Sequence, residues 1–487
     1  MTRRHLAVLA SLGPMFACAP LAASAQNTAG ALDRTKPPAL GTTPKFNLPT
    51  VASGTTSNGI ALQVVEHHAL PLVHVTLVID GGSRLEAGQP GLAGFTTRML
   101  TEGAGTRDAN ALQSELAFLG AQLNAGAGAE SFTVQLNVAK RSLGAALDLM
   151  ADVVLRPTFR SDNVKQQRDL RLQSLLQRRD QPTQLAALAF NQIVFPEGHP
   201  YHYATDGDSA STAALDSARV HTFYQRAFVP ERAKFVVVGD VTKSEMQTLL
   251  GSRFGAWKHA AEPVTIPRVT VKPVANDGVK IYLVDKPGAA QSVIQLGGPG
   301  VDRLGPDYAA VTVMNTILGA SFSSRLNTNL RETKGYTYGI NSRFAWSPLP
   351  GPFSVASSVR TNVTDSALVE IFKELRAIRD APVDAKELER AKAYVALSVP
   401  GRFETNAQVA GQLVDLGSYG LPLSSVNDFV ARVNAVTAAD VQRVARQYIL
   451  ADKATLVVVG DLAKVRAGIE ALNLGSIAVL EVSSIAR

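Results

Sequence analysis

The sequence predicts an α+β fold made of two homologous halves of roughly 220 residues, each an antiparallel sheet flanked by helices. The string FVVVGDV at 235–241 returns as LVVVGDL at 456–462, and the stretch 59–86 has the same layout as 278–305. An apolar run that ends in Gly-Asp is typical of a buried strand turning into a helix. The repetition therefore indicates one fold that occurs twice.

Strands and helices alternate within the first half. In SFTVQLNVA at 131–139, apolar and polar residues alternate, which predicts a strand with one buried face. Apolar residues at helical spacing predict helices at 108–120, 141–155 and 162–179, and Asp108 is expected to cap the first of them. Hairpin strands mixed with helices are typical of the α+β class.

The N-terminus has the layout of a secretory signal peptide over residues 1–25. Two arginines precede an apolar run, which ends in the small-residue triplet Ala-Ser-Ala. The mature chain is expected to begin at Gln26, in the periplasm or outside the cell. A lipoprotein alternative needs lipidation of Cys18, the sole cysteine, but the preceding Met-Phe-Ala is bulky for such a site.

Composition divides the mature chain into an arm, two domains and a linker. Residues 26–50 are rich in Pro, Thr and Gly and predict an extended arm, and 259–275 is a Pro-rich linker. The linker separates an N-terminal domain at 51–258 from a C-terminal domain at 276–487.

Charge and hydropathy exclude two classes of partner. The formal net charge of +7 is mild and dispersed, and does not indicate nucleic-acid binding. No apolar run after the signal approaches the roughly 18 residues of a membrane span.

Four strings carry a resemblance to a known family: GSRLEAGQPGLAGFTTRMLTEGAGTRDA, FPEGHPYHYATDGD, FVVVGD and SSRLNTNLRETKGYTYGI. Over about residues 50–470 the chain resembles the inverzincin peptidases related to pitrilysin, insulin-degrading enzyme and mitochondrial processing peptidase. The resemblance implies two half-domains that together form one half of a clamshell. In active members a helix carries H-x-x-E-H, whose histidines bind zinc and whose glutamate activates water.

Compared with that pattern, the zinc motif of this chain is degenerate. Gly94, Thr97 and Arg98 stand where the first histidine, the glutamate and the second histidine belong. On a later helix, Ser174 replaces the third ligand and Gln167 a supporting glutamate. Glycine offers no ligand, threonine no carboxylate, and a fixed guanidinium repels a metal dication. The resemblance therefore implies that this chain itself holds no metal or other cofactor.

The helix that lost its ligands is expected to be retained for packing. Its predicted core-facing residues are Leu92, Phe95, Met99 and Leu100.

Histidines elsewhere are interpreted as structural. His67 and His68 lie on a strand, with His74 beyond a Leu-Pro bend, and an exposed hairpin is favoured over a metal site. His199 and His202 lie in a Pro/Gly-rich loop, where a structural or contact role is favoured.

The second half keeps a catalytic motif that active members use. Arg331 and Tyr338 match an arginine and a tyrosine that, by the resemblance, hydrogen-bond the scissile peptide and its developing oxyanion. The resemblance implies a heterodimer in which a homologous H-x-x-E-H subunit holds zinc and peptides are the substrates. A weaker expectation places extended substrate on an edge strand at Asn124, Ala125 and Gly126.

Alternatives stay open at this point. Alone, the chain is expected to be inactive, and with its partner to be part of a zinc metalloendopeptidase. It can instead be a catalytically inert structural or binding subunit, in which Arg331 pairs with Glu332 and Tyr338 is an ordinary strand residue. A self-sufficient peptidase with an unrecognised site is the other rival.

Overall fold

The computed structural model describes residues 46–260 and 264–486. From Leu48 onward the described residues belong to one compact unit. The predicted signal peptide, its Cys18 and most of the predicted arm lie outside the described residues.

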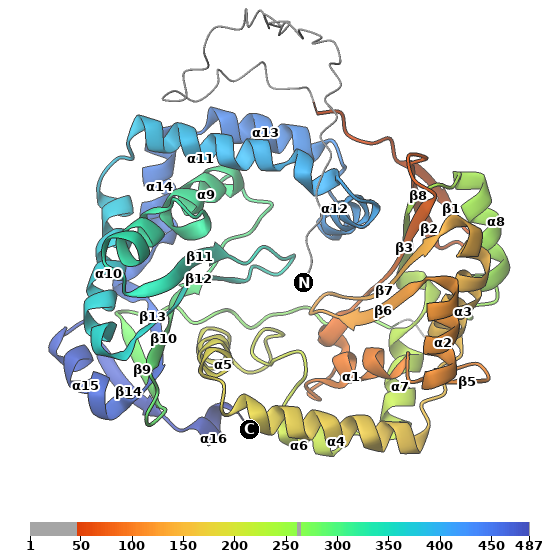
Figure 1. Ribbon diagram of the computed structural model, residues 1–487, viewed down its shortest axis with the longest axis horizontal. Helices are drawn as coiled ribbons and strands as arrows, with labels where there is room; N and C mark the ends of the chain where they lie inside the picture. The colour runs from red at the N-terminus through yellow and green to blue at the C-terminus, as the bar shows by residue number, and fades with distance from the viewer. Residues whose placement is uncertain (1–45, 261–263, 487) are drawn as a thin grey trace, which may run out of the picture. The chain divides into compact units, whose positions relative to one another are not determined.

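Two six-stranded sheets organise this unit, one from each half of the sequence (Figure 1). The first sheet has the order β1-β2-β8-β3-β7-β6 and the second the order β11-β12-β10-β13-β9-β14. The strands of the first sheet are β1 (Ala52–Thr55), β2 (Ala61–Glu66), β3 (Leu72–Asp80), β6 (Gln122–Ala127), β7 (Ser131–Ala139) and β8 (Ala233–Gly239). Those of the second are β9 (Lys280–Asp285), β10 (Gln291–Pro299), β11 (Thr337–Phe344), β12 (Pro352–Arg360), β13 (Thr455–Gly460) and β14 (Ser476–Leu480). A small hairpin pairs β4 (Gly103–Ala104) with β5 (Arg107–Asp108).

The two sheets repeat one topology. The run β2-β8-β3-β7-β6 corresponds strand by strand to β9-β13-β10-β12-β11. In both, the first two strands are parallel and the others antiparallel. The predicted α+β fold with two homologous halves is confirmed.

Helices cover the sheets. In the first half they are α1 (Leu92–Met99), α2 (Ala109–Leu119), α3 (Leu143–Leu155), α4 (Ser161–Arg178), α5 (Pro182–Val194), α6 (Ser209–Ala213), α7 (Ser217–Ala227) and α8 (Lys243–Phe254). In the second they are α9 (Tyr308–Asn315), α10 (Thr364–Asp380), α11 (Ala385–Ser398), α12 (Asn406–Ser418), α13 (Ser425–Ala435), α14 (Ala438–Tyr448), α15 (Leu462–Ala471) and α16 (Val482–Ile485), with π-helical turns η4 (Thr316–Ala320) and η5 (Asn327–Thr333). The described residues of the predicted linker 259–275 lie in no helix or strand.

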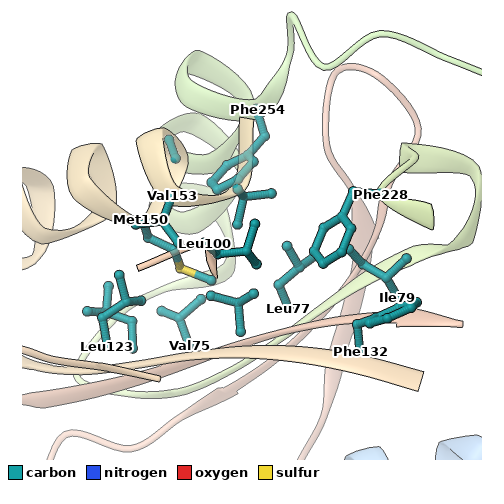
Figure 2. Close-up of a cluster of buried hydrophobic side chains, with 14 of the residues drawn as sticks. Val75, Leu77, Ile79, Leu100, Leu123, Phe132, Met150, Val153, Phe228 and Phe254 are labelled. Atoms are coloured by element: carbon teal, nitrogen blue, oxygen red, sulfur yellow. The ribbon is translucent and has the colours of Figure 1, made fainter. Parts of the chain in front are cut away.

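Local predictions for the first half hold. The apolar residues of β7 are buried and alternate with partly exposed ones, as its pattern predicts. Asp108 caps α2, since its carboxylate accepts from the Ala111 amide at 2.8 Å. In the core between this sheet and its helices, Leu77 and Ile79 of β3 lie near Phe132 and Phe228, and α3 contributes Met150 (Figure 2).

One helix from each half packs against the sheet of the other half. Helix α5, from the first half, packs on β10 and β13, where Phe190 joins a buried cluster with Val293 and Val457. Helix α12, from the second half, packs on β3 and β8, where Leu413 joins a cluster with Val236. These exchanged helices bury the second face of each sheet and join the halves by apolar contact. No helix in the described residues is long and apolar enough to cross a bilayer.

Candidate functional site

Helix α1, the counterpart of a zinc-binding helix, is packed as predicted. Leu92, Phe95, Met99 and Leu100 are all buried in the core of the first half. The helix is therefore retained as a core element.

A loop covers Gly94, which the resemblance aligns with the first zinc ligand of active members. A Cβ built on Gly94 would lie 2.7 Å from the Thr205 carbonyl oxygen, closer than real Cβ atoms approach. The same loop touches the turn before α1, because a Cβ on Gly91 would lie 2.7 Å from the Asp206 carbonyl. A Cβ on Gly207 would lie 2.3 Å from the Pro90 carbonyl. These three glycines allow two backbone segments to approach each other where a histidine would need room.

The other degenerate positions offer no set of metal ligands. The Thr97 hydroxyl is buried and lies 3.0 Å from the Ala93 carbonyl, an acceptor on its own helix. Arg98 is largely exposed and pairs with Glu102 at 3.2 Å. Ser174 is exposed on α4, and Gln167, earlier on the same helix, is partly exposed. The residues present do not fit zinc, and the described residues contain no group of three or more His, Cys, Asp or Glu side chains that could hold a metal.

Arginines of α4 occupy this region instead. Arg171 Nη1 donates to the Gly91 carbonyl at 2.9 Å, and its guanidinium lies over the Phe95 ring at 4.9 Å. Arg178, which is buried, pairs with Asp206 of the covering loop. Glu86 accepts from the Ala93 amide at 2.9 Å, and burial raises the pKa of its carboxyl to about 7. Sequence reasoning missed this network, although Arg171 and Arg178 stand in the very stretch that contains Ser174.

The expectation of an exposed hairpin is partly wrong: His67 and His68 are exposed but follow β2 rather than lie on it, and His74 is buried in β3. His67 lies 2.9 Å from Asn406 Oδ1, His68 lies 2.7 Å from Asp240 Oδ1, and the buried His74 contacts Thr76 at 3.1 Å. Burial lowers the pKa of His74.

In the loop, His202 lies 2.7 Å from the Phe195 carbonyl. His199 packs on the Phe195 ring at 4.6 Å, and burial lowers the pKa of this imidazole to about 4. Both loop histidines therefore contact Phe195, one through its carbonyl and one through its ring, as expected for a structural role.

Arg331 and Tyr338 are in direct contact. The Arg331 guanidinium carbon lies 4.9 Å from the centre of the Tyr338 ring and 4.5 Å from that of Phe322. Arg331 Nε pairs with Glu332 at 3.2 Å, so the expected ion pair and the pairing with Tyr338 coexist. Tyr338 is 89% exposed, and its hydroxyl makes no hydrogen bond among the described residues. The pair combines an exposed phenol with a partly exposed guanidinium.

A bulge in β11 turns Tyr338 outward. Thr337 pairs with Val359 and Ile340 with Ser357, so the register shifts between them. Ile340 and alternate residues after it are buried, and a regular strand would place Tyr338 on that same buried face. The Thr337 hydroxyl accepts from the Gly339 amide at 3.1 Å and lies 3.0 Å from the Ser357 hydroxyl. Side-chain hydroxyls thus form hydrogen bonds with the Gly339 backbone groups that the bulge leaves without a partner on β12.

Arg331 is carried by the π-helical turn η5. The Lys334 amide donates to the Asn329 carbonyl at 2.9 Å, and the Tyr336 amide to the Leu330 carbonyl at 2.9 Å. Gly335 has a φ of 60°, which lets the chain leave the turn and enter β11. Wide turns of this kind are frequent at functional sites.

The weakly predicted substrate strand is an edge strand. Asn124, Ala125 and Gly126 belong to β6, which pairs with β7 on one side and ends the sheet on the other. An open edge is where an extended peptide can add a strand.

A duplicated α+β fold, a core helix whose motif positions offer no zinc ligand, and an arginine–tyrosine pair with an exposed phenol together define a peptidase-like protein. Comparison with known proteins gives the family. Residues 63–195 match the family described as insulinase (peptidase family M16), and residues 214–395 match the peptidase M16 inactive domain.

Relatives support the same assignment. The chain is 32% identical over 285 residues to an uncharacterized zinc protease of Mycobacterium leprae, across 58% of this chain and 63% of that relative. It is 25% identical over 415 residues to the mitochondrial-processing peptidase subunit beta of Lentinula edodes, across 81% and 86%. A solved peptidase M16 inactive domain from Pseudomonas fluorescens is 28% identical with a TM-score of 0.77, over 84% of this chain and 98% of that one. The chain belongs to the peptidase M16 (pitrilysin, insulinase) family.

Proposed function

We propose that this chain is the non-zinc-binding subunit of a periplasmic or secreted heterodimeric zinc metallopeptidase. A homologous partner with the H-x-x-E-H motif would hold the zinc, and this chain would present Arg331 and Tyr338 to the scissile peptide. One observation carries the proposal. Arg331 and Tyr338, which match donors of active members, are in contact and Tyr338 is exposed, while a loop covers Gly94 at the first zinc-ligand position of the same chain.

The chemistry of the pair supports this role. A guanidinium has several N–H donors, and the only carboxylate paired with Arg331 among the described residues is that of Glu332. The Tyr338 phenol is a further donor without an internal partner in the described chain. Donors fixed in advance stabilise an oxyanion that develops only as the peptide carbonyl is attacked. Both therefore act on the transition state more than on the bound substrate.

The partner and the compartment are inferred from different features. The match of residues 214–395 to an inactive domain suggests pairing with an active relative. The signal-peptide pattern of residues 1–25 supports export. A neighbouring reading frame that encodes an M16 protein with H-x-x-E-H but without the Arg/Tyr pair would identify the partner.

The test uses the heterodimer purified from the native host. Arg331→Ala and Tyr338→Phe should each leave assembly intact and lower kcat by about a hundredfold, since losing one oxyanion donor costs on the order of 3 kcal/mol. Arg343→Ala is the matched control, because Arg343 is an exposed arginine on β11, the strand that carries Tyr338. The rival inert-subunit function predicts turnover within a few-fold of wild type in the double variant, and that result would refute the catalytic role.

A further inference from the structure

Phe322 shares the surface of the Arg331–Tyr338 pair. It lies in the turn between η4 and η5 and is 64% exposed. Its ring centre is 4.5 Å from the Arg331 guanidinium carbon, slightly closer than that of Tyr338 at 4.9 Å. The guanidinium therefore lies over two aromatic rings from two separate segments.

Two ring contacts restrict a long side chain. Arg331 is a flexible residue on a surface, and fixing its rotamers costs conformational entropy. Attraction between a guanidinium and the face of a ring offsets part of that cost. The guanidinium contacts the ring faces, which take no N–H into a conventional hydrogen bond, so the N–H groups beyond Nε remain available to a peptide carbonyl.

The segment that carries Phe322 is held rigidly to the rest of the site. Asn327 is buried, its Nδ2 donates to the Ser321 carbonyl at 3.3 Å, and its Oδ1 accepts from the Ile340 amide at 3.2 Å. One side chain thus joins the Phe322 turn, η5 and β11. Arg325 forms two hydrogen bonds with Glu387 of α11, at 2.8 and 2.6 Å. A bidentate arginine–carboxylate pair fixes orientation as well as position.

We propose that Phe322 is a positioning residue, which holds the Arg331 guanidinium in the orientation that meets the scissile carbonyl. This inference rests on the proposed function of Arg331. Phe322 acts through Arg331 and has no chemistry of its own in the reaction.

In the heterodimer, Phe322→Leu keeps an apolar side chain but removes the ring. It should lower kcat by about two- to fivefold, the effect of one exposed cation–π contact, and leave KM unchanged. Phe322→Tyr should stay close to wild type. In an Arg331→Ala background, Phe322→Leu should have no further effect, because the group it positions is absent.

A second readout needs no partner. In the free chain labelled with 15N-arginine, the Arg331 Nε–Hε resonance can be assigned by its loss in Arg331→Lys. Ring currents should displace it, and Phe322→Leu should move it whereas Phe322→Tyr should not.

Unchanged kcat in Phe322→Leu, alongside a large loss in Arg331→Ala, would overturn this inference alone. An equal effect of Phe322→Leu with and without Arg331 would also overturn it. If Arg331→Ala keeps full activity, the proposed function fails first. In that case a resonance unmoved by Phe322→Leu overturns the contact as well.

Discussion

Replacing Gly94 by alanine tests whether the 204–207 loop seals the first-ligand position of α1. The new Cβ would lie 2.7 Å from the Thr205 carbonyl oxygen. The Cβ position and the carbonyl oxygen are both fixed by the backbone, so no side-chain rotation can relieve the clash. The helix and the loop must therefore move apart. Overpacking of this kind costs about 1–3 kcal/mol. Without the loop, the substitution should instead stabilise the helix by up to about 1 kcal/mol, the usual gain of alanine over glycine.

The sign of the effect is therefore diagnostic, and the chain offers a matched control. Gly411 lies in the interior of α12, and a Cβ there would meet nothing within 4 Å. We expect Gly411→Ala to raise the urea concentration at the unfolding midpoint and Gly94→Ala to lower it. The dependence of the unfolding free energy on urea concentration should not change. Unfolding is followed by circular dichroism at a single pH. Thr205→Ala should not rescue Gly94→Ala, because the clash is with the carbonyl. A Gly94→Ala protein that unfolds at a higher urea concentration than wild type would refute the sealing of this site.

Further outcomes follow from other parts of the structure. The purified chain should bind no stoichiometric zinc by plasma mass spectrometry, and near one zinc per chain after dialysis against a weak chelator would favour the self-sufficient peptidase. Mass spectrometry of the exported protein should find an N-terminus at Gln26, and an acylated Cys18 would favour the lipoprotein alternative. Thr337→Val removes the hydroxyl that supports the bulge and should lower kcat of the heterodimer in the same direction as Tyr338→Phe; wild-type kcat would show that the bulge does not need it. The Glu86 carboxyl, with its pKa raised to about 7, favours the neutral form in the folded chain, so its stabilising effect is full below its ordinary pKa of 4.5 and lost as pH rises through 7. Glu86→Gln should therefore match wild type in unfolding free energy at or below about pH 4 and exceed it at pH 8 by up to about 3 kcal/mol; parallel stability curves would contradict this.

Elements defined by local pattern could be predicted from the sequence. The alternation in β7 and the cap at Asp108 depend on neighbours a few residues away, and both occur as predicted. The bulge in β11 could not be predicted, because GYTYGI reads as a regular alternating strand and its register is set by pairing with β12. The contact of Arg171 with Gly91, 80 residues apart, is equally invisible to local pattern. The sequence motif predicts Arg331 and Tyr338 as candidates, but their contact depends on the bulge and on the π-helical turn and is seen only in the folded chain.

The two candidate regions differ in a way that bears on the choice between a working and an inert subunit. At α1 the degenerate motif is closed off, since glycines allow the loop to approach, Arg171 of α4 donates to the Gly91 carbonyl before α1, and Arg178 pairs with Asp206 of the loop. At Arg331 the opposite holds. Leaving Tyr338 and Phe322 in water gives up apolar burial, and the bulge gives up regular ladder hydrogen bonds. A chain that needed only a scaffold would gain stability by turning Tyr338 inward, as a regular β11 would do. This exposure is consistent with the proposed role, in which the two donors bind a peptide carbonyl.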